Sequence, residues 1–129
     1  MTKPLALVIE DDLDLSEIFS RTLRSGGFDT ETIRDGQEAL NRLNGTPPEL
    51  ILLDLHLPHV TGATILQHIR AKEAYAKTAV IVASADARQA EELQVQADLV
   101  LLKPVSIEQL RQLAQRLLKR WGTTNISSG

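Results

Sequence analysis

Five side chains that could take part in a reaction stand at the ends of short apolar runs in this sequence. They are Glu10, Asp11, Asp54, Ser84 and Lys103. A carboxylate can act as a nucleophile or hold a hard cation such as Mg²⁺, whereas an ammonium group and a hydroxyl can stabilise an oxyanion. Each residue alone also has an ordinary role, as a helix cap, a turn residue or a solvated charge. Their joint chemistry depends on whether the fold brings them together.

The elements that would position these residues follow from the hydrophobic pattern. Short apolar runs alternate with longer stretches in which apolar residues recur every three or four positions, which predicts βαβ units around a parallel sheet. The expected strands cover residues 5–9, 28–33, 50–53, 79–83 and 99–102. The second strand mixes polar and apolar residues and suits a sheet edge. Ligands of an open parallel sheet bind beyond the carboxyl ends of its strands, so the five side chains would converge there.

Helices are expected between and after these strands. The first has four apolar residues on one face and ends at the glycine pair 26–27; the four are Leu15, Ile18, Phe19 and Leu23.

The last two predicted helices differ in their apolar content. The fourth, at about 85–96, is short and has few large apolar residues, which predicts local mobility. The fifth begins after the N-cap Ser106 and carries a strong apolar stripe to Trp121. We therefore expect one domain over residues 1–121, followed by a frayed polar tail over 122–129.

Length and composition exclude several classes of protein. A chain of 129 residues with 43% hydrophobic and 24% charged residues fits one globular domain. The formal net charge of −3 gives no chain-wide basic footprint for nucleic acid, and the absence of cysteine excludes disulfides and thiolate metal sites. No apolar run approaches the roughly 18 residues that cross a bilayer, and no secretory signal is visible. These features predict a soluble cytoplasmic protein without membrane insertion.

Taken together, the motifs resemble the receiver domains of two-component response regulators. Residues 8–12 match the acidic pair, 52–58 with Gly62 the phospho-acceptor segment, 84–85 the hydroxyl position and 103–104 the Lys-Pro pair. The match covers nearly the whole chain in the right order. It implies an α/β fold of the flavodoxin-like (βα)5 type, with a doubly wound five-stranded parallel sheet in the order 2-1-3-4-5.

The resemblance implies a role for each acidic residue, and the chemistry of the residues agrees. Asp54 would accept a phosphoryl group from a phosphohistidine as a nucleophile. An anion attacking a phosphoryl dianion needs positive charge nearby, and Mg²⁺ would supply most of it. Asp11 and Asp54 are the expected direct ligands, and Glu10 is expected to act through a water. By resemblance, the backbone carbonyl of His56 completes the protein ligands. Asp12 suits a helix start better than a metal ligand.

Lys103 and Ser84 would bind the phosphoryl oxygens, the first as a point charge and the second as a hydrogen-bond donor. Pro104 would follow a cis peptide in the family pattern. The His56 side chain would lie beside the phosphoryl group. There it either tunes how fast water hydrolyses the acyl phosphate or is a polar residue at the rim of the site. The two roles are about equally favoured.

Three departures from the family pattern concern the readout of phosphorylation. Val100 stands where a tyrosine or phenylalanine switch is usual, and Val105 replaces the usual phenylalanine after the Lys-Pro pair. The stretch from Ser84 to Lys103 is also shorter than usual. The sequence therefore predicts an intact site without the aromatic readout, so that the signal passes through the loop and fourth helix or through another rearrangement.

The leading interpretation is a signalling switch rather than a metabolic enzyme. It would receive a phosphoryl group from a histidine kinase or phosphotransfer protein and change its affinity for an unidentified downstream protein, with no nucleic acid bound by this domain. The alternative is a receiver-like scaffold that acts without phosphorylation, which Val100 and the short fourth segment favour. A third interpretation, a Mg²⁺-dependent phosphohydrolase, needs a second acid, and His56 or Asp86 is placed to supply it.

Overall fold

A five-stranded parallel sheet forms the centre of the protein. The computed structural model describes residues 3–128, with side chains for residues 3–120. The sheet order is β2-β1-β3-β4-β5, which confirms the predicted fold and the edge position of the second strand. The strands are β1 (Leu5–Ile9), β2 (Asp29–Ile33), β3 (Leu50–Asp54), β4 (Ala79–Ser84) and β5 (Leu99–Leu102).

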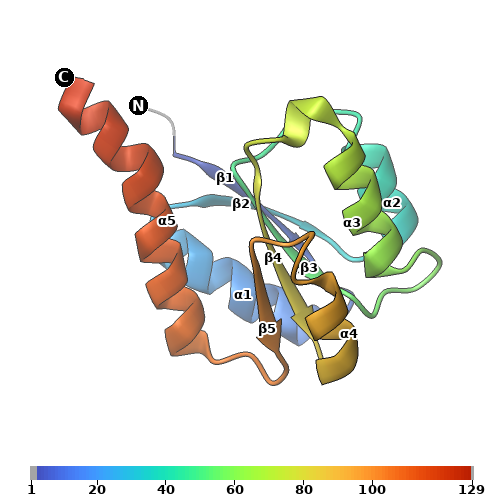
Figure 1. Cartoon of the computed structure of the whole chain (residues 1–129). Coiled ribbons are helices and arrows are strands. Elements are labelled where there is room, and N and C mark those ends of the chain that lie inside the picture. The colour runs from blue at the N-terminus through green and yellow to red at the C-terminus, as the bar shows by residue number, and fades with distance from the viewer. Residues whose placement is uncertain (1–2, 129) are drawn as a thin grey trace.

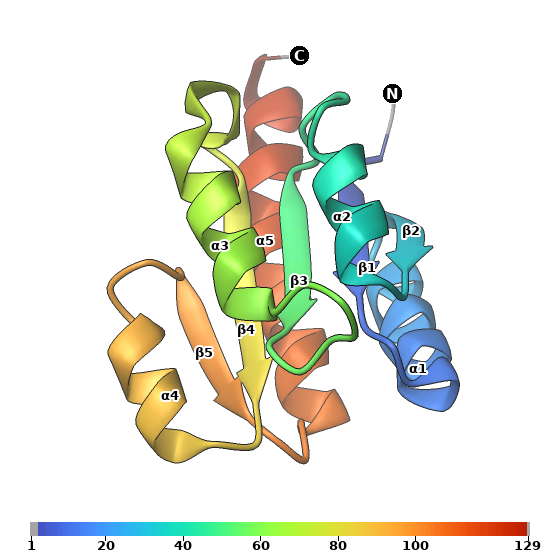
Figure 2. The ribbon, with the colours of Figure 1, turned by 90° about the vertical axis from the view of Figure 1, so that its right-hand side faces the viewer.

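Helices cover both faces of this sheet. Helices α1 and α5 pack on one face, and α2, α3 and α4 lie on the other (Figures 1 and 2). This is the three-layer arrangement expected of right-handed crossovers between parallel strands. The helices are α1 (Leu13–Ser25), α2 (Gly36–Arg42), α3 (Gly62–Ala71), the 3₁₀ turn η1 (Glu73–Tyr75), α4 (Ala87–Leu93) and α5 (Ile107–Ser128).

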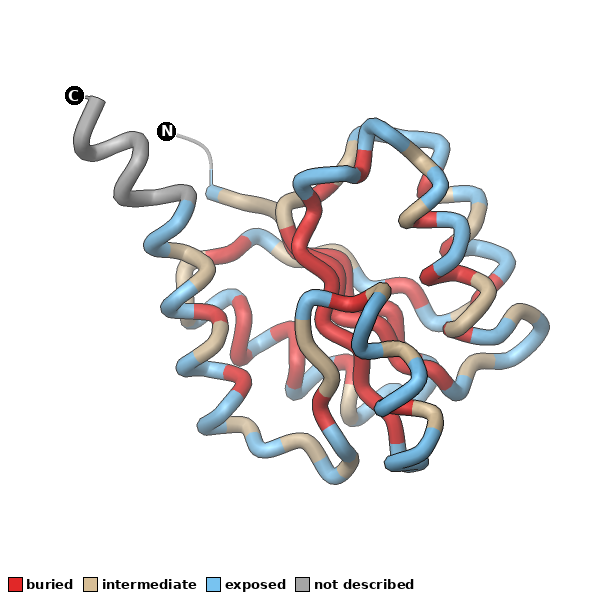
Figure 3. The backbone as a smooth tube through the Cα atoms, viewed as in Figure 1, coloured by how far each residue is buried: buried red, intermediate tan, exposed pale blue. Residues whose placement is uncertain are grey.

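The central strands are buried on both faces, as their continuous apolar sequences predict. Every residue of β3 and β4 is buried, and Figure 3 shows these strands in the buried interior. β5 is different because it is an edge strand: Leu102 is 52% exposed. Both β3 and β4 are one residue longer than predicted, so Asp54 and Ser84 are the last residues of their strands. Their positions are thereby set by the sheet.

The predicted apolar face of α1 is wrong at one position. Phe19 and Leu23 are buried against the sheet, whereas Ile18 is 42% exposed. Consecutive helical residues differ by about 100° in direction, so Ile18 lies off the stripe that contains Phe19. Asp12 is the N-cap, with its side chain accepting the Leu15 N–H at 2.9 Å, as a helix-start residue should.

Helix α4 is shorter than predicted, and its N-cap explains why. The Asp86 carboxylate accepts the N–H groups of Arg88 and Gln89, so the helix begins at Ala87 instead of residue 85. Ala90 is its one buried residue, and Val95 beyond it is 93% exposed. The helix packs mainly on β4 and β5. Few apolar contacts therefore hold it in place.

Helix α5 continues beyond the predicted end of the domain. It runs to Ser128. The frayed tail over residues 122–129 stays a prediction. The side chain of Trp121, the predicted end of the apolar stripe, lies outside the described residues, and so does Gly129. The domain boundary after residue 121 stays a prediction. Within residues 3–128, no helix combines the length and the apolar character needed to cross a lipid bilayer.

Candidate functional site

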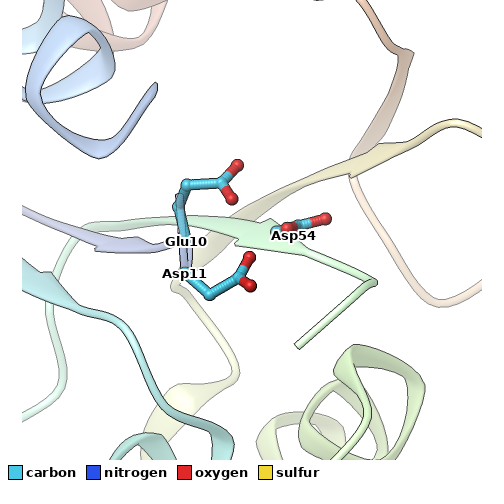
Figure 4. A group of neighbouring side chains, drawn as sticks. All are labelled: Glu10, Asp11 and Asp54. Carbon is cyan, nitrogen blue, oxygen red and sulfur yellow. The ribbon is translucent and has the colours of Figure 1, made fainter. Parts of the chain in front are cut away.

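The sheet order brings the three predicted acidic residues together. β1 pairs with β3 up to Ile9 and Leu53, so the next residues of the two strands are neighbours. The carboxylates of Glu10, Asp11 and Asp54 each offer an oxygen, and these oxygens all lie within 4.8 Å of one another. Figure 4 shows Glu10 and Asp11 at the end of β1 with Asp54 beside them at the end of β3.

Two of these carboxylates are buried and incompletely bonded. Glu10 is 2% and Asp54 3% exposed, whereas Asp11 is exposed. One oxygen of Glu10 accepts the Asp12 N–H at 3.2 Å, and one oxygen of Asp54 accepts the His56 N–H at 3.0 Å. The other two, Glu10 Oε1 and Asp54 Oδ2, have no hydrogen-bond partner among the described residues, although Glu10 Oε1 has an ion-pair contact with Lys103. A buried oxygen without a partner is costly, so this pair is arranged for a ligand, and oxygen donors of this kind suit Mg²⁺.

Lys103 supplies the positive charge of the site. Its Nζ lies 3.1 Å from Asp54 Oδ1 and 3.5 Å from Glu10 Oε1, from the end of β5. Burial opposes the charge of this ammonium group, but Asp54 and then Glu10 outweigh that effect and raise its pKa. The peptide bond to Pro104 is cis, as the family pattern implies.

One ammonium group does not balance the carboxylates around it. Burial raises the pKa of the Glu10 carboxyl from 4.5 to about 7, and the adjacent Asp54, which can accept the Glu10 proton, adds to the effect. The Asp12 N–H and the charge of Lys103 oppose the shift without cancelling it. A cation placed among these carboxylates would remove this electrostatic cost.

Ser84 and Asp86 hydrogen-bond to each other at the start of the β4–α4 turn. The Ser84 hydroxyl donates to the Asp86 carbonyl at 3.1 Å and accepts the Asp86 N–H at 3.0 Å. The Asp86 carboxylate is the cap of α4 through its Oδ1 atom. The Ser84 hydroxyl thus has to release the Asp86 carbonyl before it can donate to another acceptor.

A cleft of about 430 Å³ opens above Asp54 and reaches from α3 to α4. Two of its lining residues, Thr61 and Gln89, were not singled out from the sequence. Thr61 could have been identified from the sequence, because it directly precedes Gly62 and caps α3 by accepting the Thr64 N–H. No sequence feature identifies Gln89. The lining residues are Asp54, Leu55, His56, Thr61, Ser84, Ala85, Asp86, Gln89 and Lys103.

His56 and Val100, the predicted modulators of the site, lie in different surroundings. His56 is exposed and lines the cleft, which fits both of its proposed roles and selects neither. Val100 is half-buried and packs against the cluster beneath α2, α3 and α4. A side chain in that position is part of the core packing.

The five-stranded fold and the acidic cleft at its carboxyl edge define a receiver domain. The chain belongs to the response regulator receiver domain family, whose pattern matches residues 6–115. Its fold and its place in two-component signalling are those of this family.

Two curated relatives illustrate this similarity. The transcriptional regulatory protein PrrA of Mycobacterium leprae is 35% identical over 130 residues, which cover 99% of this chain and 55% of the relative. The DNA-binding dual master transcriptional regulator RpaA of Synechocystis is 32% identical over 120 residues, covering 91% of this chain and 50% of that protein. The chain thus spans about half the length of the curated relatives it matches. With a DNA-binding regulator among them, the prediction that no nucleic acid is bound is not supported.

A solved structure extends the comparison to the site. The receiver domain of the sensor histidine kinase PA1611 from Pseudomonas aeruginosa PAO1 superposes with a TM-score of 0.80 at 27% identity, covering 91% of this chain and 98% of that one. That structure is described with a magnesium ion coordinated in its active-site cleft. In this chain, Glu10, Asp11 and Asp54 form a cluster of three carboxylates that could hold a metal ion.

Proposed function

We propose that Asp54 accepts a phosphoryl group from a phosphohistidine in a Mg²⁺-dependent step, and that this changes the affinity of the domain for a downstream protein. One observation carries the proposal: a buried carboxylate with an unpartnered oxygen lies at the base of an open cleft, 3.1 Å from a lysine ammonium. The donor is a histidine kinase or a phosphotransfer protein, the usual partners of this family, and we place the reaction in the cytoplasm.

The acidic residues fit the metal that this reaction needs. Glu10, Asp11 and Asp54 offer three carboxylates, and the carbonyl of His56 is the proposed backbone ligand. When bound, Mg²⁺ would offset the repulsion between the carboxylate nucleophile and the phosphoryl oxygens. Asp11 and Asp54 would contact it directly and Glu10 through a water.

The transfer itself is a displacement at phosphorus. An oxygen of Asp54 forms the new P–O bond while the P–N bond of the phosphohistidine breaks, and its electron pair returns to the imidazole nitrogen. Lys103 pairs with one phosphoryl oxygen, which replaces part of its present contact with Asp54. Ser84 donates its hydroxyl to another oxygen and gives up the Asp86 carbonyl to do so.

This exchange of partners can transmit phosphorylation to the rest of the domain without an aromatic switch. The Ser84 hydroxyl donates to the Asp86 carbonyl, and Asp86 caps α4, so loss of this hydrogen bond loosens the start of that helix. Because α4 buries only Ala90 and packs mainly on two strands, its displacement costs little. We propose that this segment, rather than Val100, transmits the change.

Intact mass spectrometry after incubation with a small acyl phosphate donor tests the proposal. The wild type should gain one phosphoryl group with Mg²⁺ and none with a chelator, and Asp54→Asn should gain none. Asp12→Asn is the matched control, because asparagine is an equally good N-cap and the residue lies next to the site. Labelling of Asp54→Asn at the wild-type level would overturn the assignment.

A scaffold that acts without phosphorylation remains the second candidate, favoured by Val100 and by the short α4. Binding of the downstream protein to unphosphorylated Asp54→Asn at full affinity would select it. Asp86 is disfavoured as the second acid of a phosphohydrolase, because its Oδ1 atom already accepts two backbone N–H groups as a helix cap. His56, the other candidate for that acid, lines the cleft.

A further inference from the structure

A side-chain pair that takes no part in the proposed reaction ties the β3–α3 loop, residues 55–61, to the start of α2. His59 Nδ1 lies 2.7 Å from Asp35 Oδ2, although the two residues are 24 positions apart. The loop begins directly after Asp54 and contains His56. A contact that holds this loop therefore acts on one side of the acceptor site.

The backbone of His59 is held in an unfavourable conformation. Its φ is 69°, and it is the one residue other than glycine with a positive φ in the part of the chain that the structure describes. Non-glycine residues adopt this left-handed region at a cost in free energy, because Cβ approaches the following carbonyl oxygen. The Val60 N–H donates to the Pro58 carbonyl across His59 at 2.8 Å, and the contact of the His59 side chain with Asp35 adds to this backbone hydrogen bond in offsetting the cost.

The two segments also touch through their backbones. The Gly36 N–H donates to the Pro58 carbonyl at 3.4 Å, and a Cβ added at Gly36 would lie 2.8 Å from the Val60 Cβ and closer still to its carbonyl oxygen. The turn into α2 and the loop are thus in direct contact. The His59–Asp35 pair closes this contact at the surface.

Asp35 is a fixed anchor for the pair. Its Oδ1 accepts the N–H groups of Gln37 at 2.7 Å and Glu38 at 3.2 Å as the cap of α2, which leaves Oδ2 for His59. The Glu38 N–H, with His59 adding to it, holds the pKa of Asp35 below its usual range. Asp35 therefore stays charged through the range in which histidine side chains titrate.

We propose that His59 and Asp35 form a clasp that positions residues 55–61, and with them the His56 carbonyl, and that this clasp raises Mg²⁺ affinity at the Asp54 site. The inference rests on the proposed function, because it assigns the His56 carbonyl to the metal. Both residues are positioning residues. Neither touches the reacting atoms.

Few other charged residues surround the clasp, whose strength comes from the hydrogen bond between the His59 ring and the charged Asp35 carboxylate. The other charged residues of the α2 start are Arg34 and Glu38; α3 has no acid in its first turn, and the loop's other titratable residue is His56. The His59 side chain is 70% exposed, so solvent limits the effect to about fivefold, the ceiling for an exposed pair.

The test combines amide hydrogen exchange of residues 55–61 with Mg²⁺ titration calorimetry. The variants are Asp35→Asn, which keeps an N-cap but loses the charge, and His59→Asn, which tolerates the left-handed backbone. Each should speed loop exchange and weaken Mg²⁺ binding, by up to about fivefold. The double variant should be no worse than either single variant, because all three lack the same pair.

Glu108→Gln is the matched control, since it breaks an exposed ion pair with Arg111 at the start of α5. It should change neither measurement. Additive effects of the two clasp variants, or loop exchange equal to wild type in both variants, would overturn the clasp. If wild type binds no Mg²⁺, the proposed function fails instead, while the exchange measurement, made without metal, still decides whether the clasp exists.

Discussion

Replacing Glu10 with glutamine should stabilise the metal-free protein and remove most of its pH dependence between pH 4.5 and about 7. The Glu10 carboxyl titrates at about 7 in the fold and at 4.5 in the unfolded chain. Each pH unit of that difference is worth about 1.4 kcal/mol, so keeping Glu10 ionised in the fold costs on the order of 3 kcal/mol. Glu10→Gln removes this charge and keeps an oxygen that can accept the Asp12 N–H. We therefore expect it to gain up to that amount at pH 8.

The sign of the pH dependence follows from the raised pKa. Between pH 7 and 4.5 the folded protein holds a proton on Glu10 that the unfolded chain does not, so stability rises as the pH falls through about 7. Urea unfolding in chelator at pH 5.5 to 8.5 measures this slope directly. Saturating Mg²⁺ should flatten it, because a bound cation removes the reason for Glu10 to take up a proton.

A matched carboxylate elsewhere separates this effect from a general response to lost charge. Glu49 accepts the Leu5 N–H at 2.6 Å, at the opposite end of β1 from the site. Glu49→Gln should keep the wild-type pH slope and should not be stabilised. If Glu10→Gln is no more stable than wild type at pH 8, and the slope survives in it, the carboxylates are not crowded and the argument for a cation site fails.

Three further substitutions probe the rest of the site. Lys103→Met leaves Glu10 and Asp54 without a cation and should destabilise the chelated protein by up to about 3 kcal/mol in urea unfolding, with phosphorylation by the acyl phosphate donor lost. Gly62→Ala places a Cβ 2.5 Å from the Leu55 Cα and should cost about 1–3 kcal/mol and slow phosphorylation, which thermal melts and intact mass would show. Val100→Ala should cost about 1–2 kcal/mol of stability through lost packing. The chemical-shift changes that phosphorylation induces in α4 should persist in this variant. Their loss in the folded variant would show that Val100 helps to transmit phosphorylation to α4.

The sheet and the five residues at its carboxyl edge could be predicted from the sequence because one physical cause determines both. Strands buried on both faces must be continuous apolar runs, so the first polar residue after each run marks the strand end. Parallel pairing then places those ends on one edge. Asp54 shows this dependence most directly, since it is the last residue of a strand that is buried throughout.

The features that were not predicted depend on contacts the sequence does not display. The start of α4 depended on which residue caps the helix, and either Ser84 or Asp86 could have done so. Gln89 reaches the cleft because α4 lies beside it. His59 meets Asp35 because β2 and β3 flank β1, so the segments that follow these strands converge above its end. Each of these follows from tertiary placement rather than from local pattern.

The pairing of β1 with β3 also determines when in folding the site becomes electrostatically costly. The two strands are separated in the chain by α1, β2 and α2, so their ladder needs a long loop to close, which is a slow event. Glu10 and Asp54 stand just beyond its final pair, Ile9 with Leu53, and their charges meet only after that pair has formed. The repulsion is therefore absent from the early collapsed chain, and it raises the rate at which the folded protein unfolds. A cation bound at this site would lower the unfolding rate and leave the folding rate unchanged.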